Sequence, residues 1–107
     1  MAGNRSEGDI AAATSGIDRI IHEPARLSIL SVLHAFEEAD FVFLLKQTEL
    51  SRGNLSSHLG KLETAGYVDI AKEFVEKVPR TLVRLTESGR KAVETYRSEM
   101  NRILAGL

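Results

Sequence analysis

The spacing of apolar residues predicts a helix near the middle of the chain. Residues 50–68 read LSRGNLSSHLGKLETAGYV, and leucines recur there at i, i+4 and i+7: Leu55, Leu59 and Leu62. At about 100° per residue these positions form one narrow apolar stripe, which has to face a core. Ser51 can cap the start of a helix by accepting a hydrogen bond from a free backbone N–H, and Gly66 can take the left-handed conformation that ends one. We therefore predict a helix over about residues 52–65.

The opposite side of this helix carries small or polar groups and one lysine. Its members are Gly53, Ser57, Gly60, Lys61 and Thr64, with Asn54 and Ser56 on the flanks. This side has no carboxylate, and its glycines allow another molecule to approach the backbone. Such a surface suits the floor of a DNA major groove, which admits one helix. The alternative interpretation is an ordinary exposed helix that happens to be small and polar.

Two more helices are predicted before this one. Pro24 suits the first position of a helix that continues to about Ala35, and the apolar residues around most of its circumference place it at the centre of the core. Residues 36–40 are interpreted as an acidic link, and Asp40 can cap a short helix over about residues 41–48. The short helix, a tight turn and the leucine-striped helix form a helix-turn-helix arrangement, in which the second helix enters the groove.

After Gly66 the period of apolar residues changes from 3.6 to 2, which predicts a β-hairpin. The alternating residues are Val68, Ile70 and Phe74. We place the turn at residues 75–79 and the returning strand at residues 80–85. A hairpin directly after a recognition helix is a wing, and Lys77 and Arg80 can reach phosphates or the minor groove from it. Alternatively, these two cations only keep an exposed hairpin in solution.

Apolar edges at both ends of the chain predict helices that need a partner. Thr86 can cap a last helix whose apolar residues repeat at 3, 4, 3 and 4 residues, the heptad spacing of a coiled coil. Near the N-terminus, a short helix is expected to end near His22. The residues assigned to dimerisation are Ile17, Ile20, Ile21, Val93, Tyr96, Met100, Ile103, Leu104 and Leu107. These edges pack on each other within one chain or across a two-fold axis.

Two stretches together, GNLSSHLGKLETAGYV and PRTLVRLTESGRKAVETY, resemble the winged helix-turn-helix regulators. Among these, the chain is most similar to the small MarR- and ArsR-like regulators of archaea and bacteria, over about residues 17–104. The resemblance implies an α+β, mostly helical fold: a three-helix core, a hairpin wing, and N- and C-terminal helices for dimerisation. It also implies a homodimeric transcriptional regulator that binds double-stranded DNA. Arg52 is a departure from the family pattern, because an acidic or small residue is also common at this position in such proteins.

Length and composition indicate one globular domain. With 107 residues, 43% apolar and 27% charged, the chain is expected to have a fraying or disordered extension over residues 1–15 and one winged-helix domain over residues 16–107. Residues 87–107 of that domain are assigned to the dimerisation helix. The sequence has neither an apolar run near the about 20 residues of a membrane span nor a signal-peptide core, so we expect a cytoplasmic protein without a membrane partner. The absence of cysteine excludes disulfides and thiolate metal sites.

The distribution of charge supports a nucleic-acid partner better than the net charge of −1 does. Residues 1–50 hold four Lys or Arg and eight Asp or Glu, whereas residues 51–91 hold eight and five. Residues 92–107 hold two of each sign. The cationic excess therefore coincides with the predicted recognition helix and wing, although charge is distributed unevenly in many small proteins.

Candidate DNA contacts follow from side-chain chemistry. The carboxamide of Asn54 can bond adenine through two atoms, Lys61 suits a phosphate, and Ser56 and Ser57 suit either bases or phosphates. His58 leans towards the core and is either structural or a phosphate contact. The full set of candidates is Arg52, Gly53, Asn54, Ser56, Ser57, His58, Lys61, Lys77 and Arg80. We expect a homodimer on a roughly palindromic operator.

Other functional classes find little support in the sequence. Ser57 and His58 point about 100° apart on one helix, so they do not form a nucleophile–base pair, and we predict no enzyme. His22 and His34 lack a carboxylate at ligand spacing, so we predict no metal and no other cofactor. A winged helix that binds protein within a transcription-related complex remains the alternative function. Whether a small-molecule effector exists is open.

Overall fold

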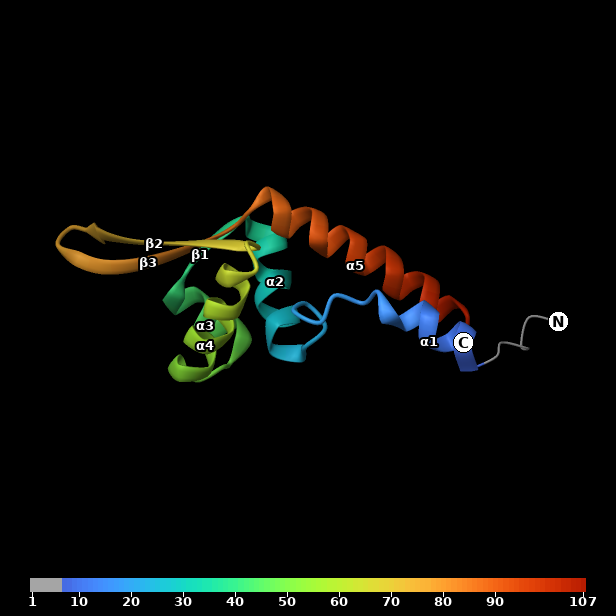
Figure 1. The fold of residues 1–107 in the computed structure, drawn as a ribbon. Helices are drawn as coiled ribbons and strands as arrows, with labels where there is room; N and C mark the ends of the chain where they lie inside the picture. Colours follow the sequence, from blue (N-terminus) through green and yellow to red (C-terminus); the bar gives the residue numbers. More distant parts are fainter. Residues whose placement is uncertain (1–6) are drawn as a thin grey trace.

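Three short helices bury their apolar stripes against one another and against the base of a β-hairpin. The computed structural model describes residues 7–107. In chain order its elements are α1 (Glu7–Ser15), α2 (Pro24–Phe36), β1 (Glu38–Asp40), α3 (Phe41–Thr48), α4 (Arg52–Thr64), β2 (Val68–Val75), β3 (Val78–Leu85) and α5 (Glu87–Ala105) (Figure 1). Leu33 of α2, Leu44 of α3 and Leu55 of α4 are fully buried in the common core. The predicted winged-helix fold is confirmed.

Capping side chains begin the helices where the sequence predicted. Asp40, Ser51 and Thr86 each accept a hydrogen bond from the backbone N–H three residues later, at 2.7, 3.1 and 2.9 Å respectively. These bonds satisfy backbone donors that have no partner inside the helix. The predicted starts of α3, α4 and α5 are therefore confirmed.

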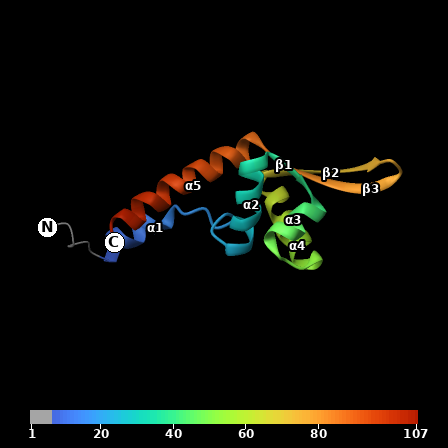
Figure 2. The ribbon, with the colours of Figure 1, turned by 180° about the vertical axis from the view of Figure 1, so that it is seen from behind.

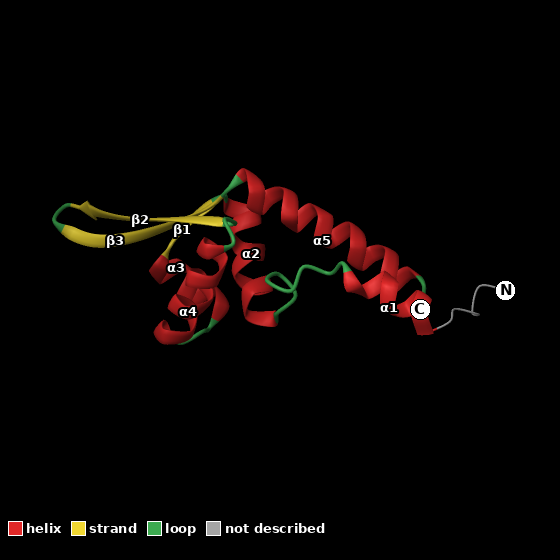
Figure 3. Ribbon diagram, in the orientation of Figure 1, coloured by secondary structure: helices red, strands yellow, loops and turns green. Residues whose placement is uncertain are grey.

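The sheet differs from the predicted two-stranded hairpin in having a third strand. Its order is β1-β3-β2, and Ala39 of β1 pairs with Val83 of β3 (Figure 3). The prediction of a link over residues 36–40 is wrong because a strand of three residues is too short to show alternation. The hairpin turn is also shorter than predicted. Only Glu76 and Lys77 form it, with φ angles of 51° and 69°, so the strands extend to Val75 and from Val78.

The N-terminal helix ends earlier than predicted, at Ser15 rather than near His22. Residues 16–22 form turns because Asp18 Oδ1 accepts hydrogen bonds from Ile20 N at 2.9 Å and Ile21 N at 3.2 Å, which competes with helix. The isoleucines therefore do not share one helical edge. Of the predicted extension over residues 1–15, residues 7–15 form α1, and residues 1–6 lie outside the described part of the chain.

The molecule is long and narrow, with principal extents of 64 × 26 × 21 Å. The hairpin projects from one end of the three-helix core, and α5 projects from the other, with α1 beside its C-terminal half (Figures 1 and 2). Within residues 7–107, no helix has the length and apolar character needed to cross a bilayer. The two projecting elements therefore extend from the core in opposite directions.

Candidate nucleic-acid interface

Helix α4, predicted to be the recognition helix, presents a buried apolar face and an exposed polar face. Leu55, Leu59 and Leu62 are buried, with exposed fractions of 0%, 3% and 0%. The exposed residues of α4 that were predicted to contact DNA are Arg52, Gly53, Asn54, Ser56, Ser57 and Lys61. The leucine stripe thus holds this polar face outwards.

The two glycines of α4 have no packing reason to be glycine. A Cβ atom placed on Gly53 or on Gly60 meets no heavy atom within 4 Å. Glycine inside a helix costs about 0.5–1 kcal/mol relative to alanine. The fold should therefore be more stable with alanine at these positions, and packing within the described chain does not require glycine at either.

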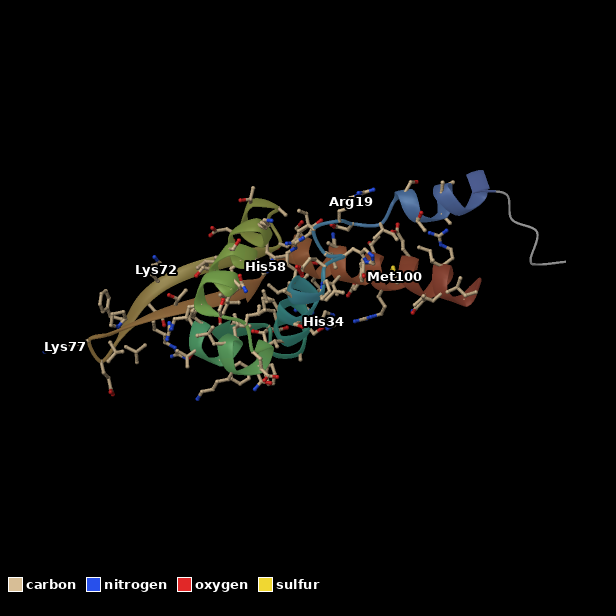
Figure 4. All side chains as sticks on the ribbon, turned by 90° about the horizontal axis from the view of Figure 1, so that it is seen from below. Arg19, His34, His58, Lys72, Lys77 and Met100 are labelled. Carbon is tan, nitrogen blue, oxygen red and sulfur yellow. The ribbon has the colours of Figure 1, made fainter. Side chains whose placement is uncertain are left out.

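A groove of about 570 Å³ separates α4 from the hairpin. Its lining residues are Phe41, Arg52, Ser56, Leu59, Gly60, Glu63, Ile70, Lys72 and Thr81. The Arg52 guanidinium lies over the Phe41 ring, 5.8 Å from its centroid. Lys72, on strand β2 of the hairpin (Figure 4), lines the other side of the groove. Sequence reasoning missed Lys72 and Thr81, although alternation from Ile70 would have placed Lys72 on this face. Glu63 brings one carboxylate to the groove.

The two predicted cations of the wing occupy different positions. Lys77 is part of the turn, at the far end of the hairpin (Figure 4). Arg80 pairs with Glu73 in the strand register, on the face opposite to Lys72, and its Nη2 lies 3.3 Å from Asp40 Oδ2. Lys77 therefore extends into solvent, whereas Arg80 is tied to the N-cap of α3.

His58 turns from α4 towards the N-terminus of α2. The buried Arg26 donates from Nη1 to His58 Nδ1 at 3.0 Å and from Nε to the carbonyl oxygen of Ile20 at 2.5 Å. Because an arginine can only donate, His58 Nδ1 carries a lone pair and the ring proton lies on Nε2. That Nε2 lies 3.6 Å from Glu23 Oε2. Protein groups thus surround the imidazole, and its side chain is 19% exposed.

Glu23 joins this contact to the start of α2. Its Oε1 accepts hydrogen bonds from the backbone N–H groups of Ala25 and Arg26, the latter at 3.0 Å. Burial raises the pKa of Glu23, but the two backbone bonds and the nearby His58 and Arg26 outweigh it, so the pKa lies below its ordinary value. The Glu23 carboxylate therefore caps α2 and at the same time faces His58 of α4.

The turns of residues 16–22 make two more contacts with distant elements. The Tyr67 hydroxyl, just after α4, donates to Asp18 Oδ2. This hydrogen bond, followed by burial and the charge of Asp18, raises the pKa of Tyr67 to about 12. His22 Nδ1 and the Tyr96 hydroxyl of α5 lie 2.8 Å apart. The segment before α2 thus links the end of the recognition helix to the long C-terminal helix.

The residues predicted to mediate dimerisation fall into three groups. Ile21 is fully buried within the single chain, so it belongs to the core. Val93 and Tyr96 of α5 and Ile20 pack partly against that core, and Ile17, Met100 and Ile103 are half-buried. Leu104 and Leu107 are 56% and 98% exposed. The free apolar surface therefore grows towards the end of α5.

Among the described residues, the structure shows no cluster of three or more His, Cys, Asp or Glu side chains that could hold a metal ion. A hollow of about 200 Å³ lies between α2 and α5, lined by residues that include Leu27, His34 and Tyr96. It is smaller than the roughly 300–1,000 Å³ usual for a small-molecule site. The single chain therefore offers limited room for an effector at this position.

Comparison with known proteins agrees with this geometry. Residues 25–104 match the family described as winged helix DNA-binding domain. The chain belongs to this family. An uncharacterized protein, MJ0432 of Methanocaldococcus jannaschii, is 33% identical to this winged-helix chain over 73% of its length and 85% of the relative. The uncharacterized HTH-type transcriptional regulator YdgJ of Bacillus subtilis is 27% identical over 92% of the winged-helix chain and 65% of the relative.

Among solved structures, the transcriptional regulator homologue protein of Pyrococcus horikoshii OT3 shares the winged-helix fold with a TM-score of 0.81. The two sequences are 29% identical, and the matched region covers 91% of this chain and 94% of the Pyrococcus chain. Solved MarR-family and ArsR-family regulators share the fold as well. The resemblance to winged helix-turn-helix regulators is therefore confirmed.

Proposed function

We propose that this winged-helix protein acts as a homodimer that binds a roughly palindromic operator in double-stranded DNA and regulates transcription. In this proposal the two α4 helices enter successive major grooves, one helical turn or about 34 Å apart, and each hairpin lies over the flanking backbone. The observation that carries the proposal is the outward face of α4. It combines small polar side chains, one lysine and two glycines whose replacement by alanine the fold would accept.

The shape of α5 supports a dimer. A helix of 19 residues is about 28 Å long, and only its first half packs on the core. Leu104 and Leu107 are exposed and Met100 and Ile103 are only half-buried, so one chain leaves part of this apolar surface uncovered. A second copy related by a two-fold axis would bury it together with Ile17 and Ile20, and would place the two α4 helices on one side.

Each candidate residue has a role in this arrangement. Asn54 is assigned to a base edge. Gly53, Ser56 and Ser57 are assigned to the floor of the DNA major groove or to phosphates. Lys61, Arg52 and Lys77 are assigned to phosphates, joined by Lys72. Arg80 is also assigned to the DNA backbone, which it would contact while keeping its ion pair with Asp40. His58 is proposed to orient α4 through Arg26 and Glu23 rather than to contact DNA.

The test combines binding-site selection with a measurement of mass. The full chain is used to select duplexes from a random library, and light scattering then gives the mass of the free protein relative to the 11.8 kDa chain. We expect an enriched, roughly palindromic duplex and twice the chain mass. Lys61→Glu should abolish binding, while Lys91→Glu, an exposed lysine on α5, should leave it intact.

A second outcome would favour the alternative function. If the folded wild-type dimer shows no salt-sensitive binding to any duplex, the proposal fails, because phosphate neutralisation makes DNA affinity depend on salt. The alternative function, a winged helix that contacts protein within a transcription complex, would then be favoured, and the net charge of −1 is consistent with it.

A further inference from the structure

The tip of the β2–β3 hairpin carries exposed apolar side chains. Phe74 is 75% exposed, Val78 62% and Val75 42%, and Pro79 lies opposite Phe74 in the strand register. None of them belongs to the core cluster or packs against it. Their contribution to stability is limited to cross-strand pairing within the hairpin, and a group of exposed apolar side chains favours association with another surface.

We propose that Phe74 is an apolar wedge that enters the DNA minor groove next to the major groove occupied by α4, partly unstacks one base step there and bends the duplex. Apolar wedges of this kind are one way in which proteins kink DNA from the minor groove. The inference rests on the proposed function, since it concerns the same DNA, and it adds a deformation of that DNA to the binding.

The strand register directs Phe74 towards the DNA side of the hairpin. Side chains at alternate positions share one face of a strand, so Ile70, Lys72 and Phe74 point the same way. Lys72 and its partner Thr81 line the groove next to α4. Phe74 and Pro79 are the next pair on that face, two residues further along each strand.

The groove itself has the arrangement that such binding requires. A helix in the major groove and a hairpin in the adjacent minor groove have one sugar–phosphate backbone between them. The groove places Arg52 and Glu63 on the α4 side and Lys72 on the hairpin wall, so its two cations outnumber its one carboxylate, which suits a polyanion that runs between them. Beyond that backbone, the next element along the hairpin is the apolar tip.

The minor groove of B-form DNA is about 6 Å wide, so we expect the Phe74 side chain to enter it rather than the two-stranded hairpin as a whole. The turn consists of Glu76 and Lys77 alone, both with left-handed backbone, so no loop widens the end of the hairpin. The hairpin projects alone from the core, with no helix beside its outer half (Figure 1). Nothing in the described chain would block its entry.

Charge at the tip is compatible with a polyanion. The charged residues of the segment 72–80 are Lys72, Glu73, Glu76, Lys77 and Arg80, a net charge of +1. Glu73 and Arg80 are partners in the strand register, and the guanidinium of Arg80 lies 3.3 Å from Asp40 Oδ2. Glu76 remains beside Lys77 in the turn.

The small apolar area favours DNA over a protein partner. A phenylalanine buries about 150–250 Å² at most, and the neighbouring tip side chains are smaller. A stable protein interface buries about 800 Å² on each partner. One aromatic ring is too little for such an interface, but one apolar side chain suffices for a wedge between base steps.

The experiment measures DNA bending with the full chain and a duplex enriched from a random library by the wild type, labelled at its two ends for energy transfer. We expect the wild type to shorten the end-to-end distance. Phe74→Ala should bind about tenfold more weakly and leave the duplex nearly straight, given the usual cost of losing an aromatic–base contact. Phe74→Leu should keep much of the bend, because leucine also acts as a wedge. The control is Phe36→Ala, which removes a 61% exposed phenylalanine at the end of α2 together with its edge-to-face contact with Phe43, away from the hairpin tip.

Phe74→Ala should melt close to the wild-type temperature, since the substitution removes only the cross-strand pair with Pro79 and no core contact. The inference is overturned if Phe74→Ala binds and bends the duplex like the wild type. It is also overturned if the substitution removes only a higher-order assembly seen by sedimentation velocity, because the tip would then be a protein contact. A wild type that binds no duplex refutes the proposed function instead, and that result is visible before any variant is made.

Discussion

Gly89, in the first turn of α5, packs against the backbone carbonyl of Tyr67 at the base of the hairpin, so closely that a Cβ atom at residue 89 would collide with that oxygen. Two hydrogen bonds hold this approach. Thr86 N donates to the Tyr67 oxygen at 3.0 Å, and Thr86 Oγ1 donates to the Gly66 oxygen at 2.6 Å. The glycine therefore sets where the long helix leaves the core.

We predict that Gly89→Ala lowers the free energy of unfolding by about 2–3 kcal/mol, because α5 or the hairpin must move to admit the methyl group. Urea titrations followed by circular dichroism, at one protein concentration, measure the change. Gly53→Ala is the control, since its Cβ meets open space. A loss under about 0.5 kcal/mol at Gly89 would show that the contact relaxes freely.

Gly60→Ala should have opposite effects on stability and on binding. It should raise the free energy of unfolding by about 0.5–1 kcal/mol, because alanine favours helix and its Cβ meets no atom. It should also weaken binding to the selected duplex severalfold, because the methyl group stands on the proposed DNA face. Thermal melts and gel-shift titrations of the same preparation measure both quantities. Unchanged affinity would remove Gly60 from the interface.

Tyr67→Phe should reveal the hydrogen bond to Asp18 through its dependence on pH. At neutral pH we expect a loss of about 1 kcal/mol in the free energy of unfolding. The folded chain holds the Tyr67 proton with a pKa of about 12, against an ordinary value of 10.0. The stabilisation is thus complete below pH 10 and declines as pH rises from about 10 to 12. Urea titrations across this range should show the two proteins converging, and a constant difference would contradict the assignment.

Lys61→Ala should weaken binding to all duplex sequences alike. If Lys61 neutralises one phosphate, the slope of log K against log salt should become less steep by about one unit. Fluorescence anisotropy at several salt concentrations measures the slope, with Lys91→Ala on α5 as the matched control. A slope equal to the wild type would place Lys61 outside the interface.

Asn54→Ala should instead change sequence preference. A carboxamide that bonds one adenine contributes about 1–3 kcal/mol of discrimination, so its loss should relax one base pair in each half-site. Binding-site selection with the variant and the wild type checks this. Identical consensus sequences would rule out a base contact by Asn54.

Local signals allowed much of the helical fold to be predicted. Capping residues such as Asp40, Ser51 and Thr86 act on backbone donors within three residues, so their effect is visible in the sequence. The apolar stripe of α4 is equally local, because helix periodicity depends on neighbouring turns. The N-terminal helix was predicted too long because the competing Asp18 turn offers no periodic signal.

The candidate site was predicted only in part, because some of its features depend on local signals and others on contacts between distant residues. The exposed face of α4 follows from the position of its leucines, whereas the groove beside it depends on the register between the hairpin and the helix. Lys72 enters that groove, and Arg80 leaves it for Asp40, through pairings that connect distant residues.

Propensity, capping and periodicity act over a few residues, so the amino-acid sequence alone predicted α2, α3, α4, α5, the hairpin and the polar side of α4. The folded chain was needed to show that β1 joins the sheet, that Ile21 belongs to the core, and that His58 turns towards Arg26 and Glu23. Each of these depends on contacts between segments far apart in the chain, and such contacts exist only after the core has brought those segments together.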